Sequence, residues 1–183
     1  LVQEALSEIS TQADRLSKII QRVRTYAKRQ HHEVKQENLS EIVDRALVSF
    51  RRSSLSSGVD VEVKAPGKAD ALADALELEL LIVNLLKNAA AASKDSREKL
   101  ISVQLSEEAN EWLLSVSDHG QVISDKLLSR LSHPAKSFSN GLGLGLSICR
   151  LIAENHGGKL TFKPNNSKGL IVTLHLPKAN KEI

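Results

Sequence analysis

Residues 140–150 read NGLGLGLSICR, where Gly141, Gly143 and Gly145 alternate with leucines and lead into a helix-like run. Glycine adopts positive φ without steric cost, and a helix N-terminus presents unpaired N–H groups at the positive end of its dipole. Together these features favour a phosphate-binding loop. A flexible loop before an amphipathic helix is the alternative for so short a motif, so the rest of the sequence has to decide.

The composition limits the classes of protein to which the chain can belong. Its 183 residues suffice for one domain of about 150 residues with an appendage. The mixed charge, 25 basic against 22 acidic residues, and the scarcity of aromatic residues predict no nucleic-acid partner. Cys149 is the only cysteine, which excludes an internal disulfide and predicts a small buried residue in a reducing compartment. Without a long apolar run or a signal pattern, we expect a cytoplasmic fragment that makes no direct membrane contact.

Residues 1–30 carry a heptad pattern, with apolar side chains at alternating steps of three and four: Leu6, Ile9, Ala13, Leu16, Ile20, Val23 and Ala27. This spacing predicts one long helix with a single apolar stripe. Such a helix cannot bury its stripe alone, so we expect partner helices, either in a homodimer or in sequence upstream of residue 1.

The remaining chain mixes helical and strand patterns. Helices are predicted over 41–50, 77–93, 125–131 and 146–155, and strands over 59–64, 99–108, 111–120, 159–165 and 169–177. Neighbouring strands follow one another without a strict βαβ repeat. We therefore expect an α+β fold, a two-layer sandwich with helices on one face of a mainly antiparallel or mixed sheet.

Three familiar phosphate-binding loops do not fit the glycine motif. A dinucleotide fold places its glycines directly after a strand, whereas here they follow a polar loop. The GxxxxGK[ST] pattern of a P-loop is absent, and so are the HRD and DFG segments of the eukaryotic type of protein kinase.

Several features in a fixed order resemble the catalytic, ATP-binding domain of sensor histidine kinases, whose fold is shared with gyrase, Hsp90 and MutL. NLLKNAAAA at 84–92 resembles the N box, DHGQVI at 118–123 the G1 box, and GLGLGLSI at 141–148 the G2 box. GLIVTLHLP at 169–177 resembles the closing strand. The resemblance implies a Bergerat-type ATP-binding domain over 34–183, preceded at 1–33 by a linker and the second helix of the dimerisation domain.

The resemblance also assigns roles to the asparagines of the buried helix 77–93. A buried amide without partners costs about 1–3 kcal/mol, so Asn84 and Asn88 either bond to nearby backbone or serve a ligand. By resemblance, Asn88 supplies an oxygen to Mg²⁺. Asn84 stands where ATP-hydrolysing relatives carry a glutamate base, and a neutral amide cannot deprotonate water, which favours a kinase.

Other roles concern the nucleotide itself. Asp118 follows an apolar strand, and its carboxylate would accept a hydrogen bond from the adenine amine with Gly120 beside it. Lys136 matches a lysine of the lid that precedes the glycines. The phosphates would lie against the backbone of the glycine loop, Gly141, Leu142, Gly143, Leu144 and Gly145. ATP and Mg²⁺ are thus the implied cofactors.

The chain departs from the family pattern at a few positions. Val122 replaces a second glycine of the G1 box, and Ile171 stands where a threonine commonly lines the adenine pocket. His32 and Glu33 imitate the phosphoacceptor dipeptide, but they follow the heptad helix and lack the proline, so we interpret them as linker. We expect the remaining histidines to lie on the surface or beside the site: His119, His133, His156 and His175.

The sequence therefore predicts the ATP-binding part of a two-component sensor histidine kinase, and an inner-membrane sensor is one candidate for the parent protein. It would transfer the γ-phosphoryl group of ATP to a histidine outside residues 1–183, for relay to the receiver domain of a response regulator. One alternative is a degenerate module that dimerises and binds the regulator with weak or no nucleotide binding. An ATPase of the same fold is another, which Asn84 disfavours.

Overall fold

A computed structural model describes residues 33–132, 144–166 and 168–178. The chain divides into two units, Leu1–Glu33 and Val34–Ile183. The heptad helix and the dimerisation role predicted for residues 1–33 lie outside the described residues, except for Glu33. In the part of the chain that is described, no helix is both long and apolar enough to cross a bilayer.

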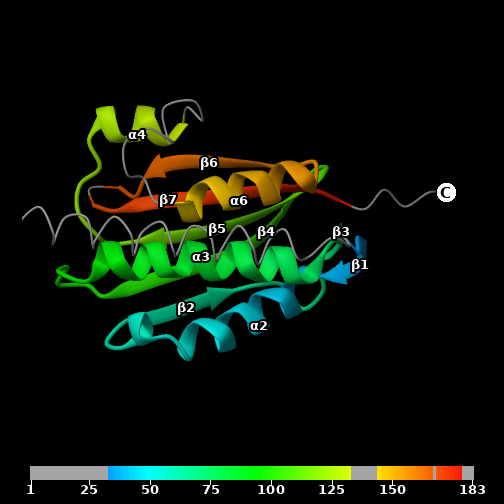
Figure 1. Ribbon diagram of the computed structural model, residues 1–183, viewed down its shortest axis with the longest axis horizontal. Coiled ribbons are helices and arrows are strands. Elements are labelled where there is room, and N and C mark those ends of the chain that lie inside the picture. Colours follow the sequence, from blue (N-terminus) through cyan, green and yellow to red (C-terminus); the bar gives the residue numbers. More distant parts are fainter. Residues whose placement is uncertain (1–32, 133–143, 167, 179–183) are drawn as a thin grey trace, which may run out of the picture. The chain divides into compact units, whose positions relative to one another are not determined.

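A five-stranded sheet, ordered β2-β4-β5-β7-β6, organises the second unit (Figure 1). Its strands are β2 (Asp60–Lys64), β4 (Leu100–Glu108), β5 (Glu111–Asp118), β6 (Lys159–Pro164) and β7 (Leu170–Pro177). β2 pairs with β4 in parallel, and the other three pairings are antiparallel. The mixed sheet matches the predicted fold class.

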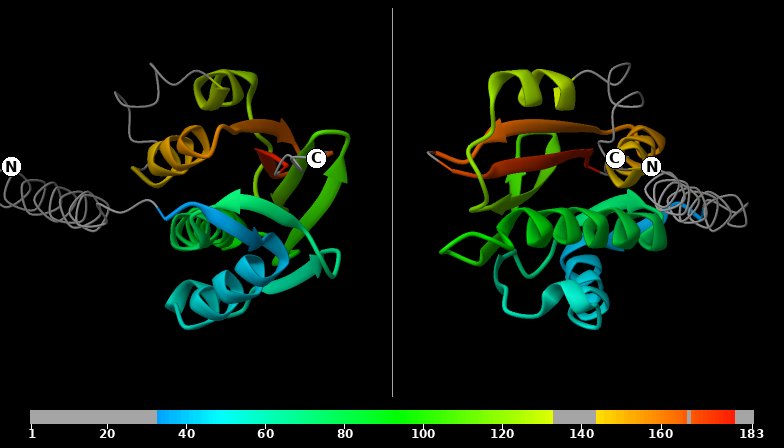
Figure 2. Two further views of the ribbon diagram at one scale, coloured as in Figure 1. Left: turned by 90° about the vertical axis from the view of Figure 1, so that its right-hand side faces the viewer. Right: turned by 60° about the vertical axis from the view of Figure 1, so that its left-hand side comes forward.

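Three helices, α2 (Leu39–Arg51), α3 (Ala75–Ser93) and α6 (Leu144–Asn155), cover one face of this sheet (Figure 2). Every second residue of the central strands points toward them, as in β5, where Trp112, Leu114, Val116 and Asp118 are all buried. The intervening residues of β5 are more exposed. The strand is thus half-buried, which is what the alternation of its sequence predicts.

Helix α3 lies at the centre of the helical layer because it is apolar on several sides. It contacts α2, α6, β4 and β5, and its buried side chains are mostly aliphatic: Leu78, Leu81, Ile82, Leu85, Leu86, Ala89 and Ala90. Asp74 caps its N-terminus, with a side-chain oxygen that accepts from the backbone N–H groups of Leu76 and Glu77.

Two short strands, β1 (Lys35–Asn38) and β3 (Asp70–Ala73), form a separate antiparallel sheet that the sequence did not predict. Asn38 ends β1 and caps α2, because its side-chain oxygen accepts from the backbone N–H groups of Ser40 and Ala69. The remaining elements are a 3₁₀ turn (Ser54–Ser56) and helix α4 (Asp125–Ser132), which contacts β6. Helix α4 agrees with the helical pattern predicted over 125–131.

Candidate functional site

Asp118 is the last residue of β5 and points into the layer between the sheet and the helices, with only 6% of its surface exposed. One carboxylate oxygen, Oδ1, accepts a hydrogen bond of 2.8 Å from the backbone N–H of Gly120. Burial raises the pKa of this carboxyl, although the backbone N–H groups of Gly120 and Leu170 and the nearby His119 act in the opposite direction. A buried acceptor of this kind is suited to a ligand that donates a hydrogen bond.

The turn after Asp118 is packed too closely for side chains. A Cβ on Gly120 would lie 2.7 Å from the carbonyl oxygen of Ala92, near the end of α3. Gly169 has φ +88°, and a Cβ there would overlap the carbonyl oxygen of Asp118. The Nδ2 of Asn165 donates to that same oxygen at 2.7 Å. The turn between β6 and β7 therefore holds the end of β5 in place.

The two asparagines of α3 differ in their surroundings. Asn84 is 8% exposed, and its Nδ2 donates 3.0 Å to the carbonyl oxygen of Leu80, one turn earlier. The alternative that the amide bonds to nearby backbone therefore holds for Asn84. Asn88, one turn later, is exposed. Its amide oxygen can reach a solvated cation, and Mg²⁺ commonly takes few protein ligands beside water and phosphate.

Helices α3 and α6 lie antiparallel, which brings the start of α6 toward these asparagines. The ring of His156, just after α6, accepts through Nε2 from the backbone N–H of Asp74 at 3.0 Å. Further along, the Sγ of Cys149 lies 3.7 Å from the carbonyl oxygen of Leu81. One further turn along each helix, the buried Gly145 of α6 lies level with the stretch of α3 between Asn84 and Asn88.

This arrangement brings together Asp118, Gly120 and the α3 asparagines on one side, and the N-terminal turn of α6 on the other. The first backbone N–H groups of a helix have no partner within the helix, so this turn can bind an anion. Four of the predicted residues, Lys136, Gly141, Leu142 and Gly143, lie outside the described residues, as does the side chain of Leu144. Among the described residues, no three histidines, cysteines, aspartates or glutamates cluster as a metal site.

The two departures from the family pattern look different in the structure. Val122 is 71% exposed, beside a hollow of about 280 Å³ that Ala92, Gly120 and Lys168 also line. Its φ is not positive, so a valine fits there without backbone strain. The expectation for Ile171 is wrong, because Ile171 pairs with Ser117 and shares its face, which is opposite to Asp118. Leu170, whose N–H bonds to Asp118, is the neighbour on the correct side.

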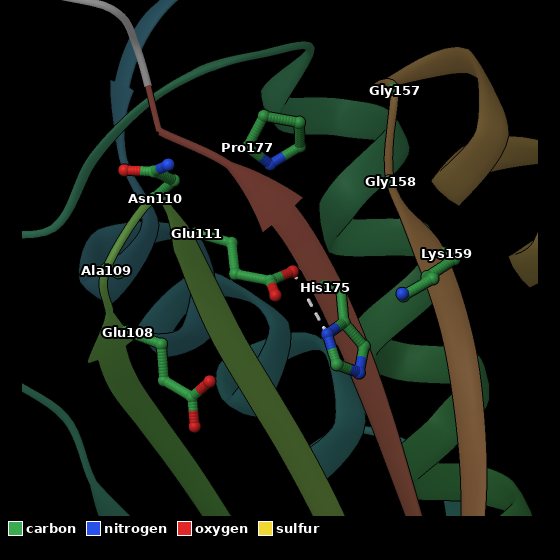
Figure 3. Close-up of a pocket in the computed structure, with 9 residues that line it drawn as sticks. All are labelled: Glu108, Ala109, Asn110, Glu111, Gly157, Gly158, Lys159, His175 and Pro177. Carbon is green, nitrogen blue, oxygen red and sulfur yellow. Dashed lines mark hydrogen bonds and ion pairs between the residues drawn. The ribbon is translucent and has the colours of Figure 1, made fainter.

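A larger hollow, about 510 Å³, lies at the other end of β5 and contains none of the predicted site residues (Figure 3). There the Nδ1 of His175 lies 3.0 Å from the Oε2 of Glu111, while the Nε2 of His175 lies 3.0 Å from the hydroxyl of Thr161. Both ring nitrogens of His175 thus have a hydrogen-bond partner. The Glu111 carboxylate is 38% exposed and is already paired with this side chain.

His156 was expected on the surface or beside the site, but the structure buries its side chain to 1% exposure. Its Nδ1 bonds to the carbonyl oxygen of Ile152 at 2.7 Å, while Nε2 accepts from Asp74. The ring is the neutral tautomer with the proton on Nδ1, because Nε2 receives a hydrogen bond from a backbone N–H. His156 therefore joins α3 to α6 and is a structural residue that the sequence pattern did not reveal.

Comparison with known families agrees with this geometry. Residues 73–180 match the family described as histidine kinase-, DNA gyrase B-, and HSP90-like ATPase. The sensor protein FixL of Bradyrhizobium diazoefficiens is 30% identical over 98% of this chain. The C4-dicarboxylate transport sensor protein DctS of Rhodobacter capsulatus is 29% identical over 97% of it. The chain spans only 36% and 28% of these two relatives.

Solved structures of a histidine kinase are also similar to this chain. The nucleotide-free catalytic domain of the histidine kinase ThkA is 26% identical, with a TM-score of 0.68 over 80% of this chain and 97% of that domain. ThkA in complex with the response regulator protein TrrA is 25% identical, with a TM-score of 0.73, and covers 96% of this chain and 51% of that one. These similarities favour an ATP-binding catalytic domain over the degenerate module.

Proposed function

The chain belongs to the histidine kinase-, DNA gyrase B- and HSP90-like ATPase family, as an ATP-binding domain of the sensor histidine kinase type, and we propose that it supplies the γ-phosphoryl group of ATP to a histidine outside residues 1–183. The observation that carries the proposal is Asp118, a buried carboxylate at a strand end whose neighbours are glycines and backbone. It is able to accept a hydrogen bond from the amine of adenine and repels the O6 acceptor of guanine.

The phosphates would lie between the start of α6 and the exposed amide of Asn88. Backbone N–H groups and the helix dipole stabilise negative charge there. Asn88 would supply one oxygen to Mg²⁺, which neutralises charge on the phosphates when it is bound. Phosphoryl transfer depends mostly on such positioning and charge neutralisation.

The chain's own residues disfavour hydrolysis of ATP by water. Asn84 is neutral, and its amide already donates to the carbonyl oxygen of Leu80. It cannot act as a general base. A histidine acceptor needs no such base when its imidazole is neutral. Transfer to histidine rather than to water is therefore the reaction that this site supports best.

The partners follow from the same proposal. A response regulator receiver domain would take the phosphoryl group from the histidine, as the pairing of ThkA with TrrA suggests for this type of kinase. The heptad pattern of residues 1–30 would bring two chains together. We also propose a cytoplasmic location for this part of the parent protein.

The test has a binding arm and a transfer arm. Calorimetric titration should show that ATP binds more tightly than GTP, and that Mg²⁺ strengthens ATP binding in the parent more than in Asn88→Ala. With γ-labelled ATP, residues 1–183 alone should stay unlabelled, whereas a chain extended upstream to include the acceptor helix should become labelled. Equal affinity for ATP and GTP, or labelling of His31 or His32, would contradict the proposal.

A further inference from the structure

Arg150 joins three elements of the fold. It belongs to α6, its Nη2 donates to the backbone carbonyl oxygen of Leu131 in α4, and its guanidinium lies 4.9 Å from the ring centroid of Phe162 in β6. Phe162 is buried at 8% exposure, so the ring is a fixed surface for the guanidinium. Arg150 therefore holds α4 against α6 and β6.

The carbonyl oxygen of Leu131 is one that a helix cannot satisfy by itself. Helix α4 ends at Ser132, and the last four carbonyl groups of a helix lack partners within it. A guanidinium there satisfies one of them and interacts favourably with the negative end of the helix dipole. The guanidinium lies partly out of water, and this burial lowers the pKa of Arg150, opposed by the charge of Glu154.

Arg150 connects α4 to α6, the helix whose first turn forms the proposed phosphate side of the site. Helix α4 ends at Ser132, and α6 begins at Leu144 with the N–H groups that are proposed to face the phosphates. Fixing one helix against the other lowers the conformational entropy that nucleotide binding would otherwise have to remove. The contact thus preorganises the start of α6 relative to α4.

The base side of the site is held by other contacts. Asp118 is fixed by Gly120 in the turn after β5, and by Asn165 and Gly169 in the turn between β6 and β7. None of these contacts involves Arg150 or α4. The supports of the two halves therefore share no residue, although Phe162 and Asn165 both belong to the β6–β7 hairpin.

We propose that Arg150 is a positioning residue for the phosphate half of the nucleotide site and has no role in the adenine half. The inference rests on the proposed function, because it requires that nucleotide binds between Asp118 and the start of α6. It predicts that losing the guanidinium weakens binding of the phosphates while the affinity for the nucleoside stays the same.

The experiment compares ATP with adenosine on four proteins: the parent, Arg150→Met, Arg150→Lys and Arg45→Met. Arg45, on α2, pairs with Glu79 and is not one of the predicted site residues, and its loss controls for the removal of one positive charge. Affinities are measured by competition against a fluorescent ATP analogue. Circular dichroism checks that each variant is folded.

Arg150→Met should weaken ATP binding about tenfold and leave adenosine binding unchanged, and Arg45→Met should change neither. Arg150→Lys, which keeps the charge and a donor but not the planar fork, should lie between the parent and Arg150→Met and remains informative if the methionine variant does not fold. Equal losses for ATP and adenosine, or no loss for ATP, would overturn the inference. A parent that binds neither ligand would instead overturn the proposed function, and the inference with it.

Discussion

Strand β5 carries a carboxylate at each end, and the two ends of the strand are built differently. Asp118 is buried, and the contacts around it come from backbone N–H groups and closely packed glycines. Glu111 is 38% exposed and pairs with the imidazole of His175 in the hollow of about 510 Å³. A carboxylate that is in contact with water and already paired with a side chain gains less from binding a ligand than a buried carboxylate does.

The size of a hollow is a poor guide to the position of the functional site in this domain. The hollow beside Glu111 is about 510 Å³ and the one beside Gly120 about 280 Å³, yet the predicted site residue Gly120 lines the smaller one and none of the predicted site residues lines the larger. What distinguishes the Asp118 end is a desolvated acceptor whose hydrogen bonds come from the backbone N–H groups of Gly120 and Leu170.

The largest effect is expected where a glycine touches strand backbone. A Cβ at Gly169 would overlap the carbonyl oxygen of Asp118, and the residue has φ +88°, so Gly169→Ala should lower the free energy of unfolding by about 2–4 kcal/mol. Gly158→Ala is the matched variant at the other end, because its Cβ would overlap the carbonyl oxygen of His175. Urea denaturation measures both.

Nucleotide binding separates the two glycine variants. At a temperature where both are folded, Gly158→Ala should bind ATP as the parent does, whereas Gly169→Ala should bind more weakly because Asp118 is displaced. If Gly158→Ala loses ATP binding as strongly as Gly169→Ala, the two ends of β5 are not independent and the comparison fails.

The next largest effect is on affinity. Losing a charge-assisted hydrogen bond in a desolvated pocket costs about 1.5–3 kcal/mol, so Asp118→Asn should weaken ATP binding by about ten- to 150-fold. The amide keeps the shape of the carboxylate but turns one acceptor into a donor that faces the adenine amine. Glu111→Gln makes the same chemical change at the other end and should leave the affinity as it is. Calorimetry with ATP measures both variants, and equal affinities for Asp118→Asn and the parent would remove Asp118 from the adenine pocket.

Much of this arrangement was predictable because its signals are periodic and local. The alternation in 111–118 places Asp118 on the same face as Trp112, Leu114 and Val116, and the apolar run in 77–93 predicts the central helix. The sheet, the helical layer and the resemblance to an ATP-binding domain followed from such patterns.

The parts that were missed depend on pairs of residues far apart in the chain. The His156 to Asp74 bond joins residues 82 positions apart, and the Asn165 to Asp118 bond joins residues 47 positions apart. Strands β1 and β3 have four residues each and are held by pairing with each other, with no alternation to reveal them. Ile171 was placed one residue out of register, and one residue moves a side chain to the opposite face of a sheet.

A third prediction concerns the nucleotide-free protein and its dependence on pH. Burial raises the pKa of Asp118, so its contribution to stability is fully present below the pKa of the unfolded chain and is lost as pH rises through the folded value. At neutral pH, Asp118→Asn should therefore unfold at higher urea than the parent, and the gain should vanish in acid. A variant less stable than the parent at every pH would show that the ionised carboxylate does not destabilise the folded state.

The smallest effect is expected at the Glu111 end. The pair between Glu111 and His175 is partly exposed, and such pairs contribute about 0–1 kcal/mol, so Glu111→Gln should change the free energy of unfolding by less than about 1 kcal/mol. A double-mutant cycle with His175→Asn isolates the pair from the hydrogen bond between His175 and Thr161. A coupling energy well above that range would mean that this end also holds its carboxylate tightly. In that case a side chain would hold Glu111 as firmly as backbone groups hold Asp118. The two carboxylates would then differ only in the kind of partner that holds each of them.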